Sequence, residues 1–239
     1  MGECALISVF WRIFMLDERL SLCAEFVTQG GRVCDVGTDH AYLVAHLLIS
    51  GKSASAIACD IADGPLLSAK MTIEKNNLCD RAEVIKSDGL DSISPDGITD
   101  VVIAGMGGEL ITDIVLRTEW LKNNVNLVLQ PMTKPEILRE SLMKNGYEII
   151  KEECASDKNH AYTVICFKYT GNSKENVSLK EKWLGKISDN KNPHNIAYAE
   201  LFLSKENKII NGMKLSEDTK YIEEHEKTAK IFEDFLKGR

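Results

Sequence analysis

Short apolar runs alternate with helical patterns over residues 31 to 169 of this chain. The apolar runs predict strands at 32–36, 56–60, 82–86, 100–104, 126–130, 147–153 and 162–169. The segments between them predict helices at 41–49, at 64–76, from about 109, and at 135–144. No helix-length segment separates the last two predicted strands.

This alternation of strand and helix is typical of parallel strands joined by crossover helices that cover both faces of a sheet. The short connection before the last strand indicates one reversed strand near the sheet edge. The predicted fold class is therefore α/β: a doubly wound, mostly parallel, seven-stranded Rossmann-like sheet with a helical C-terminal extension.

The pattern changes near residue 170, after which no strand is predicted. A leading helix is expected at about 179–187, followed by a hairpin of two longer helices with three-four apolar spacing. We therefore expect a doubly wound domain over 16–170 and a helical, coiled-coil-like domain over 171–239. Residues 1–15 are interpreted as an N-terminal extension, which the intact mass of the native protein would test.

Composition and charge exclude several classes of protein. Of the 239 residues, 44% are hydrophobic and 27% charged, with a net charge of −7. These values exclude a disordered or fibrous chain, and a polycation that coats nucleic acid by charge alone. The seven cysteines are scattered and contain no Cys-x-x-Cys pair, which favours reduced thiols and no metal site. The apolar stretch 5–16 is too short to cross a bilayer and lacks a basic start, so we expect a cytoplasmic protein with no membrane association.

The first candidate site follows the first predicted strand, in the sequence Asp35-Val-Gly-Thr-Asp-His40. In open parallel sheets, ligands bind beyond the carboxyl ends of the strands, near the point where strand order reverses. Gly37 permits a tight turn and a close approach of the backbone to a ligand. The full dinucleotide motif with three glycines is absent, and Asp35 and Asp39 would repel a pyrophosphate. The loop therefore suits a cationic or polyol ligand better than NAD.

Acidic residues also follow the second and third predicted strands, at Asp60 and Asp88. A carboxylate at the first position accepts hydrogen bonds from ribose hydroxyls, and one at the second is placed to reach an adenine ring. A single Asp is more often a loop residue or a helix cap. Three such residues after three strands fit S-adenosylmethionine, which combines a sulfonium, a ribose and an adenine without phosphate.

A run of glycines, Gly105-Met-Gly-Gly108, follows the fourth predicted strand. It is explained either as a tight turn into a helix or as a surface that lets a flat substrate approach amides at a helix N-terminus. Three glycines in four residues exceed what a turn needs, which favours the substrate site. Gln130 after the fifth strand would complete the rim. Tyr162 opens the last strand and faces either the same cleft or solvent.

Together, the segments 35–43, 60–70, 103–108 and 129–131 resemble the bacterial tRNA (adenine-22 N1)-methyltransferase family, TrmK, over about residues 16–169. The resemblance implies a class I methyltransferase with S-adenosylmethionine as donor and N1 of an adenine in tRNA as acceptor. The implied cofactor-binding residues are Asp35, Gly37, Thr38, Asp39, His40, Asp60, Ile61, Asp88, Gly89 and Gly105. The candidate catalytic residues are Asp39, Gly105, Met106, Gly107, Gly108, Gln130 and Tyr162, of which Gly105 to Gly108 and Gln130 follow from the resemblance.

Two other functions stay open on the sequence alone. A small-molecule methyltransferase would keep the same donor loop. A noncatalytic S-adenosylmethionine- or RNA-binding module is favoured by Met132, which stands where the family has Asn. A monomer is expected, or a weak dimer through the helical tail.

Because the doubly wound domain carries most of the acidic excess, tRNA binding would need local basic residues. Near the rim these are Lys134 and Arg139, and in the tail Lys180, Lys182, Lys186, Lys205 and Lys208. A solvated helix face explains the tail lysines equally well.

Overall fold

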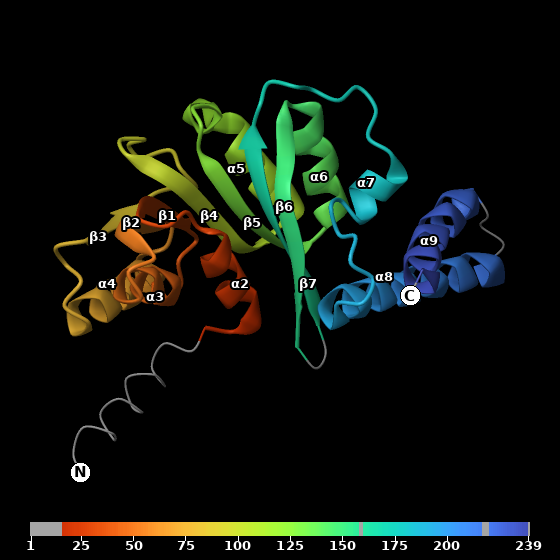
Figure 1. Cartoon of the computed structure of the whole chain (residues 1–239), viewed down its shortest axis with the longest axis horizontal. Helices are drawn as coiled ribbons and strands as arrows, with labels where there is room; N and C mark the ends of the chain where they lie inside the picture. Colours follow the sequence, from red (N-terminus) through yellow and green to blue (C-terminus); the bar gives the residue numbers. More distant parts are fainter. Residues whose placement is uncertain (1–15, 158–159, 217–219, 239) are drawn as a thin grey trace, which may run out of the picture.

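A computed structural model of the chain describes residues 16–157, 160–216 and 220–238. The N-terminal extension expected at 1–15 lies outside these described residues. The structure is built around one sheet with helices on both of its faces and a pair of long helices to one side (Figure 1).

The sheet has seven strands in the order β3-β2-β1-β4-β5-β7-β6. Their bounds are β1 Gly31–Val36, β2 Ser53–Asp60, β3 Ala82–Lys86, β4 Ile98–Gly107, β5 Asn126–Thr133, β6 Tyr147–Ser156 and β7 Ala161–Tyr169. Strands β1 to β5 pair in parallel, and β7 runs antiparallel to both β5 and β6. The predicted fold class, including the single reversed strand near the edge, is confirmed.

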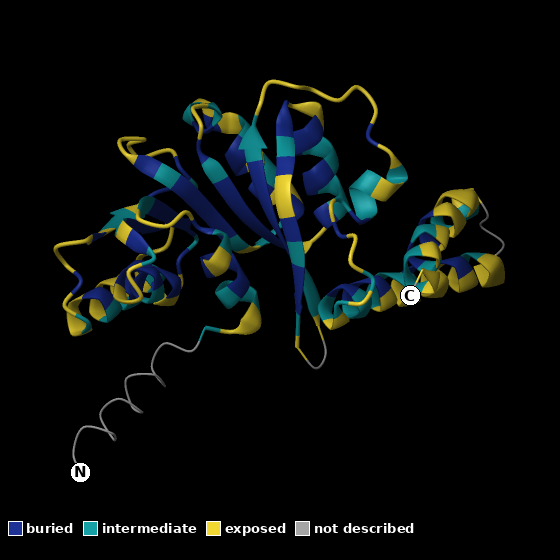
Figure 2. Cartoon of the chain, viewed as in Figure 1, coloured by how far each residue is buried: buried dark blue, intermediate teal, exposed yellow. Residues whose placement is uncertain are grey.

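The helices form two layers because the central strands are apolar throughout, and successive residues point to opposite faces of the sheet. Helices α2 (Glu18–Phe26), α3 (Tyr42–Ile49) and α4 (Asp63–Lys75) pack with Val33 of β1 on one face. Helices α5 (Gly108–Arg117) and α6 (Pro135–Lys144), with the short η1 (Glu119–Lys122), pack with Cys34 on the other face. Figure 2 shows the strands as the most buried part of the molecule. The carboxyl ends of β1 and β4 thus lie side by side between the two layers, where the strand order reverses.

Two predicted strand ends are wrong. The strand expected to stop at Ala104 continues as β4 through the glycine run to Gly107, and β5 continues past Gln130 to Thr133. Pairing goes on between these segments through two register shifts, with Met106 opposite Pro131. Such bulges let a strand pass a proline, which has no N–H to donate. The leading C-terminal helix is also shorter than predicted: α7 spans Leu179–Trp183, whereas a helix over about 179–187 was expected.

The C-terminal hairpin consists of α8 (Pro193–Ser216) and α9 (Ile222–Lys237). Aromatic side chains hold it together, and Phe202 lies between Tyr198 and Phe232 with ring centroids at 4.6 and 5.7 Å. Cys154 of β6 belongs to the same buried cluster. The helical tail is therefore packed on the sheet rather than tethered beside it. No helix within the described ranges is long and apolar enough to cross a membrane.

A buried ion pair joins the sheet, α6 and the tail. Arg139 and Glu152 have fully buried side chains, and the guanidinium donates to the carboxylate at 2.7 Å. The same carboxylate accepts from Thr163 and from the backbone N–H of Lys186, while Arg139 also donates to the Tyr198 hydroxyl. The sequence-based assignment of Arg139 to an RNA-binding rim is wrong, because the buried carboxylate holds its charge inside the protein.

Candidate active site

A cavity of about 310 Å³ opens where β1 and β4 end. Its walls come from the β1–α3 loop, from the end of β4 and from α2. Six residues predicted for the site line it: Asp35, Gly37, Thr38, Asp39, His40 and Gly105. This is the position at which doubly wound sheets bind their ligands.

Asp35 supplies a buried carboxylate to the cavity. It is the penultimate residue of β1 and only 7% exposed. Burial raises its pKa to about 6, with Asp60 acting in the same direction and the Thr38 and Arg19 side chains opposing it. A carboxylate placed in this way gains most from a ligand that brings a positive charge.

The β1–α3 loop is held by two backbone hydrogen bonds. The N–H groups of Gly37 and Thr38 both donate to the carbonyl of Cys59, at 2.9 and 3.0 Å. Gly37 has φ +77°, a conformation that L side chains rarely adopt. The Thr38 hydroxyl is buried beside Asp35, yet within the described chain it has no hydrogen-bond partner of normal geometry. An orphaned polar atom in a cavity wall fits a site that receives a polar ligand.

Arg19 of α2 is a site residue that the sequence analysis missed. Its half-buried side chain lines the cavity and donates to the Gln130 side-chain oxygen at 2.8 Å. The guanidinium also pairs with Asp17 at 3.3 Å. The one available signal was its place in the segment Leu16–Leu20, which was used only to locate the start of the domain. Arg19 gives the cavity a cation beside the Asp35 carboxylate.

Gln130 does not line the cavity as expected. It lies behind the cavity wall and forms hydrogen bonds to two residues that do line it. It is fully buried at 0% exposure. Its side-chain oxygen accepts from Arg19 and from the N–H of Gly105, and its amide donates to the Pro131 carbonyl. Gln130 therefore fixes Arg19 and the end of β4 in place.

The other residues of the glycine run meet protein atoms. The ε-methyl of Met106 lies against the α-carbon of Gly37, where an added Cβ would come within 2.2 Å of it. A Cβ on Gly108 would lie 2.3 Å from the Lys134 carbonyl oxygen, and one on Gly107 would lie 3.3 Å from the Thr133 hydroxyl. Within this run, only Gly105 lines the cavity. Close packing of β4 against the β5–α6 turn accounts for the last two glycines.

Asp39 and His40 form the outer rim of the cavity. Their side chains are 3.4 Å apart, and the Asp39 side chain is 80% exposed. The His40 ring stacks on Tyr42, with centroids 5.1 Å apart. These side chains are accessible to a ligand that arrives from solvent.

The remaining predicted residues lie outside the lining of this cavity. Asp60 is close enough to affect the pKa of Asp35, and it accepts from the N–H of Ala62 at 2.8 Å, as an Asp at a helix entry commonly does. Ile61 is 60% exposed at the start of the same turn.

Asp88 pairs with Arg117 at 2.7 Å, and Gly89 packs beside that guanidinium. Tyr162 stacks on His160 at the start of β7, with centroids 6.0 Å apart.

The cavity residues fit S-adenosylmethionine by their chemistry. A buried carboxylate, a guanidinium and an unpartnered hydroxyl suit a ligand that carries a cationic centre, a carboxylate and an amino group. Asp35 would face the positive centre and Arg19 the carboxylate, while Asp60, which lies outside the cavity lining, would have to reach the ribose from the end of β2. Over the described residues, no group of three or more His, Cys, Asp and Glu side chains could hold a metal ion.

Comparison with known proteins shows that the chain contains a methyltransferase domain. A family model described as a methyltransferase domain matches residues 16–165. The tRNA (adenine(22)-N(1))-methyltransferase of Bacillus subtilis is 37% identical over 151 residues, which span 63% of this chain and 63% of that protein. The match to this curated relative thus covers less than two thirds of its length.

Solved structures match over more of the chain. The B. subtilis m1A22 tRNA methyltransferase TrmK superposes with a TM-score of 0.82 at 28% identity, covering 93% of this chain and 99% of that one. The M. capricolum TrmK, solved with S-adenosyl-homocysteine, gives a TM-score of 0.78 at 27% identity, covering 93% and 98%. The chain therefore belongs to the methyltransferase-domain family, and TrmK enzymes are among the solved structures that it resembles over nearly its whole length.

Proposed function

We propose that this chain transfers the methyl group of S-adenosylmethionine to N1 of an unpaired adenine in tRNA, position 22 by analogy with its relatives. The observation that carries the proposal is the cavity at the ends of β1 and β4, where Asp35, Arg19 and the Thr38 hydroxyl converge. S-adenosylmethionine bound there would supply a methyl group on a positively charged sulfur.

The methyl transfer requires no general acid or general base from the protein. The N1 lone pair forms the new N–CH3 bond as the S–CH3 bond breaks, and the positive charge passes from sulfur to the base. No proton has to leave in this step. The main catalytic task is alignment of nucleophile, methyl group and sulfur, which can contribute up to roughly 7–11 kcal/mol in ideal cases.

Within this scheme the residues have separate tasks. Asp35 and Arg19 orient the donor, and Gln130 holds Arg19 and Gly105 in position. The exposed carboxylate of Asp39 stabilises the cationic product and polarises the adenine amino group. Because N1 lies on the base-pairing edge, the adenine must enter the site unpaired.

We further propose that residues 16–170 hold this chemistry and that 171–239 contribute to RNA binding in a monomer acting in the cytoplasm. The tail lysines differ in availability. Lys182 pairs with Glu140 at 2.8 Å, and the Lys205 ammonium lies 4.7 Å from the centre of the Phe202 ring. If lysines contact phosphates, tRNA affinity falls steeply as salt is added. Light scattering on the purified chain tests the monomer.

The function is tested by incubating the full chain with labelled S-adenosylmethionine and a bacterial tRNA transcript that has adenine at position 22, followed by nucleoside analysis. Label in 1-methyladenosine is expected, and a matched transcript with guanine at position 22 should stay unlabelled. Donor binding without RNA labelling would overturn the proposal in favour of a small-molecule methyltransferase or a noncatalytic module.

A further inference from the structure

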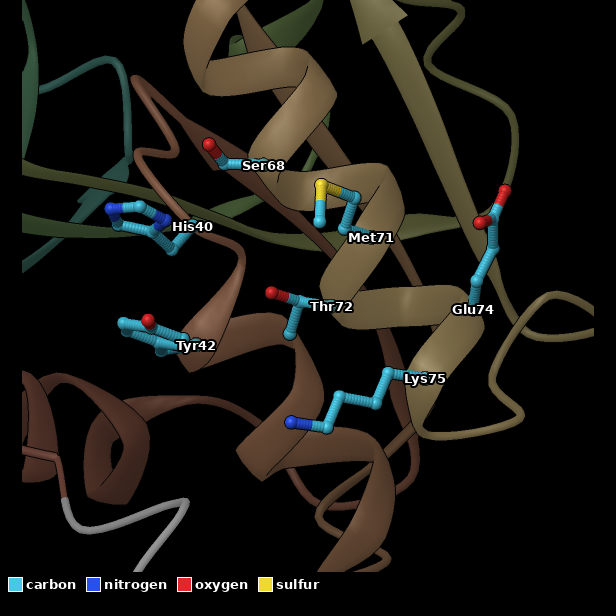
Figure 3. A pocket seen from close by; sticks show the side chains of 7 residues that line it. All are labelled: His40, Tyr42, Ser68, Met71, Thr72, Glu74 and Lys75. Carbon is cyan, nitrogen blue, oxygen red and sulfur yellow. The ribbon is translucent and has the colours of Figure 1, made fainter.

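A second cavity, of about 560 Å³, lies next to the donor cavity between the start of α3 and the outer face of α4. We call it the α3–α4 groove, and its lining includes His40, Tyr42, Ser68, Met71, Thr72 and Lys75 (Figure 3). His40 and Tyr42 also line the donor cavity. The two cavities therefore share a wall, and none of the donor-binding tasks assigned above uses the α4 side of the groove.

One wall of the groove is an aromatic platform. The rings of His40 and Tyr42 are stacked with an interplanar angle of 15°, and Tyr42 is 46% exposed. Ala41 between them has φ +52°, a strained conformation for a residue with a side chain. Strain of this kind concentrates at ligand sites, and exposed stacked rings are a surface on which nucleic-acid bases bind.

The opposite wall comes from α4. Met71 is 63% exposed although it is a large apolar side chain, and Thr72 adds a hydroxyl beside it. A thioether makes favourable contacts with aromatic rings. Figure 3 shows Met71 and Thr72 across from the His40–Tyr42 rings. The gap between the walls suits a flat ring with polar edges.

A cation closes one end of the groove. Lys75, in the last turn of α4, is exposed and extends into the groove in Figure 3. No ion pair to its ammonium occurs within residues 16–157, 160–216 and 220–238. The neighbouring carboxylate of Glu74 points away from the rings. A base on the platform would thus place its phosphate toward a free ammonium.

We propose that the α3–α4 groove binds one unpaired nucleotide of the RNA substrate close to the target adenine, with its base against His40 and Tyr42 and its phosphate at Lys75. The inference rests on the proposed function, because a shared wall makes the two nucleotides neighbours only if RNA enters the donor site. Figure 1 supports this path, since α4, α3, α2 and the start of α8 follow one another along one side of the molecule.

The test uses full-length variants and two separate binding measurements. Lys75→Ala removes the cation at one end of the groove and Met71→Asp alters the α4 wall, and neither residue lines the donor cavity. Lys75→Arg and Met71→Leu are the conservative partners. Lys122→Ala, in η1 on the opposite face of the sheet, is the matched control for loss of one positive charge. Fluorescence anisotropy gives the Kd for tRNA over a range of salt, and calorimetry gives the Kd for S-adenosylmethionine.

Lys75→Ala should raise the Kd for tRNA by about 3- to 10-fold and reduce the slope of log K against log salt by about 0.7–0.9, as expected for one phosphate contact. Met71→Asp should raise the Kd for tRNA by about 10-fold or more, because it replaces an apolar contact to the base with a carboxylate that repels the RNA backbone. The conservative and control variants should bind tRNA like wild type, and the Kd for S-adenosylmethionine should stay within about twofold throughout.

Unchanged tRNA affinity in both Lys75→Ala and Met71→Asp would overturn the groove proposal, even if wild type methylates tRNA normally. The two failures can be distinguished: if wild type forms no 1-methyladenosine but both variants lose tRNA affinity, the proposed reaction is wrong, and with it the place of the groove beside a target adenine, while RNA binding by the groove itself is supported. Ultraviolet crosslinking adds a third readout, with nucleotide adducts expected on peptides containing Tyr42 or Met71. Adducts confined to the C-terminal helices would contradict the groove.

Discussion

The guanidinium of Arg19 donates a 2.8 Å hydrogen bond to the side-chain oxygen of Gln130, a residue 111 positions further along the chain. The same oxygen accepts the N–H of Gly105 at 3.0 Å. One buried amide thus positions both a cation of the donor cavity and the part of β4 that lines the cavity. Because the Gln130 side chain is fully buried and both bonds end on it, loss of the amide should affect the cavity and the fold together.

Gln130→Ala should weaken S-adenosylmethionine binding by about tenfold, since Arg19 loses its anchor, and lower the free energy of unfolding by about 1–3 kcal/mol, since buried donors lose their acceptor. Calorimetry and urea denaturation measure the two effects. Gln130→Glu keeps an acceptor for both bonds and should retain more donor affinity than the Ala variant. Wild-type donor affinity in Gln130→Ala would show that the position of Arg19 is unimportant.

Asp35→Asn should stabilise the protein measured without donor at pH 7. The carboxyl has a pKa of about 6 in the folded chain, against 3.8 for an unperturbed Asp, so the folded state holds the proton more tightly. The protonated Asp35 carboxyl therefore contributes fully to the free energy of unfolding below pH 4, and this contribution is lost as the pH rises through 6. The difference between the two pKa values corresponds to at most about 3 kcal/mol of the free energy of unfolding at pH 7. A neutral amide would restore this amount, because it carries no charge to bury. Asp39→Asn, at an exposed site, should change the free energy of unfolding by less than about 0.5 kcal/mol.

Donor affinity should fall as the pH is lowered through about 6, because protonation removes the Asp35 charge that faces the cationic donor. The measurement is the Kd for S-adenosylmethionine by calorimetry from pH 5 to 8. In Asp35→Asn the affinity should be lower at every pH and lose most of this dependence. A wild-type profile that is flat across this range would remove Asp35 from the contact with the donor.

Gly108→Ala should be strongly destabilising, by about 3 kcal/mol, because the new Cβ would lie 2.3 Å from a backbone carbonyl that has little room to move. Gly212→Ala in α8 is the matched control, since among the described residues no atom outside its own stretch of helix lies within 4 Å of the added Cβ. It should stabilise the chain by about 0.5–1 kcal/mol through helix propensity. Chemical denaturation of both variants checks the pair, and equal stabilities would contradict the packing described for Gly108.

The sheet was predictable from the sequence because its central strands are buried on both faces. Residues such as Val33 and Cys34 face opposite helix layers, so a continuous apolar run marks the strand whichever face is considered. The ends of β4 and β5 were not predictable. Their pairing continues through glycine and proline by register shifts, and local propensity carries no signal for such shifts.

The part of the donor cavity that lies in the loop directly after β1 was predictable from the sequence. Asp35 to His40 are consecutive or nearly so, and the end of β1 brings them to one place. Arg19 was missed because it reaches the cavity from a helix that precedes the sheet. Arg139 was misplaced because the sequence does not distinguish an arginine on a surface from one that meets Glu152 inside. Both errors concern long side chains whose partners are set by tertiary packing.

The sealed ion pair of Arg139 and Glu152 has a consequence for cooperativity. Two of its further partners lie in the tail: the Lys186 N–H donates to Glu152, and the Tyr198 hydroxyl accepts from Arg139. A chain truncated before these residues would leave two charges with an incomplete set of partners and the apolar surface around Cys154 uncovered. The sheet and the C-terminal helices are thus expected to unfold in a single transition, so the tail cannot be exchanged as an independent module.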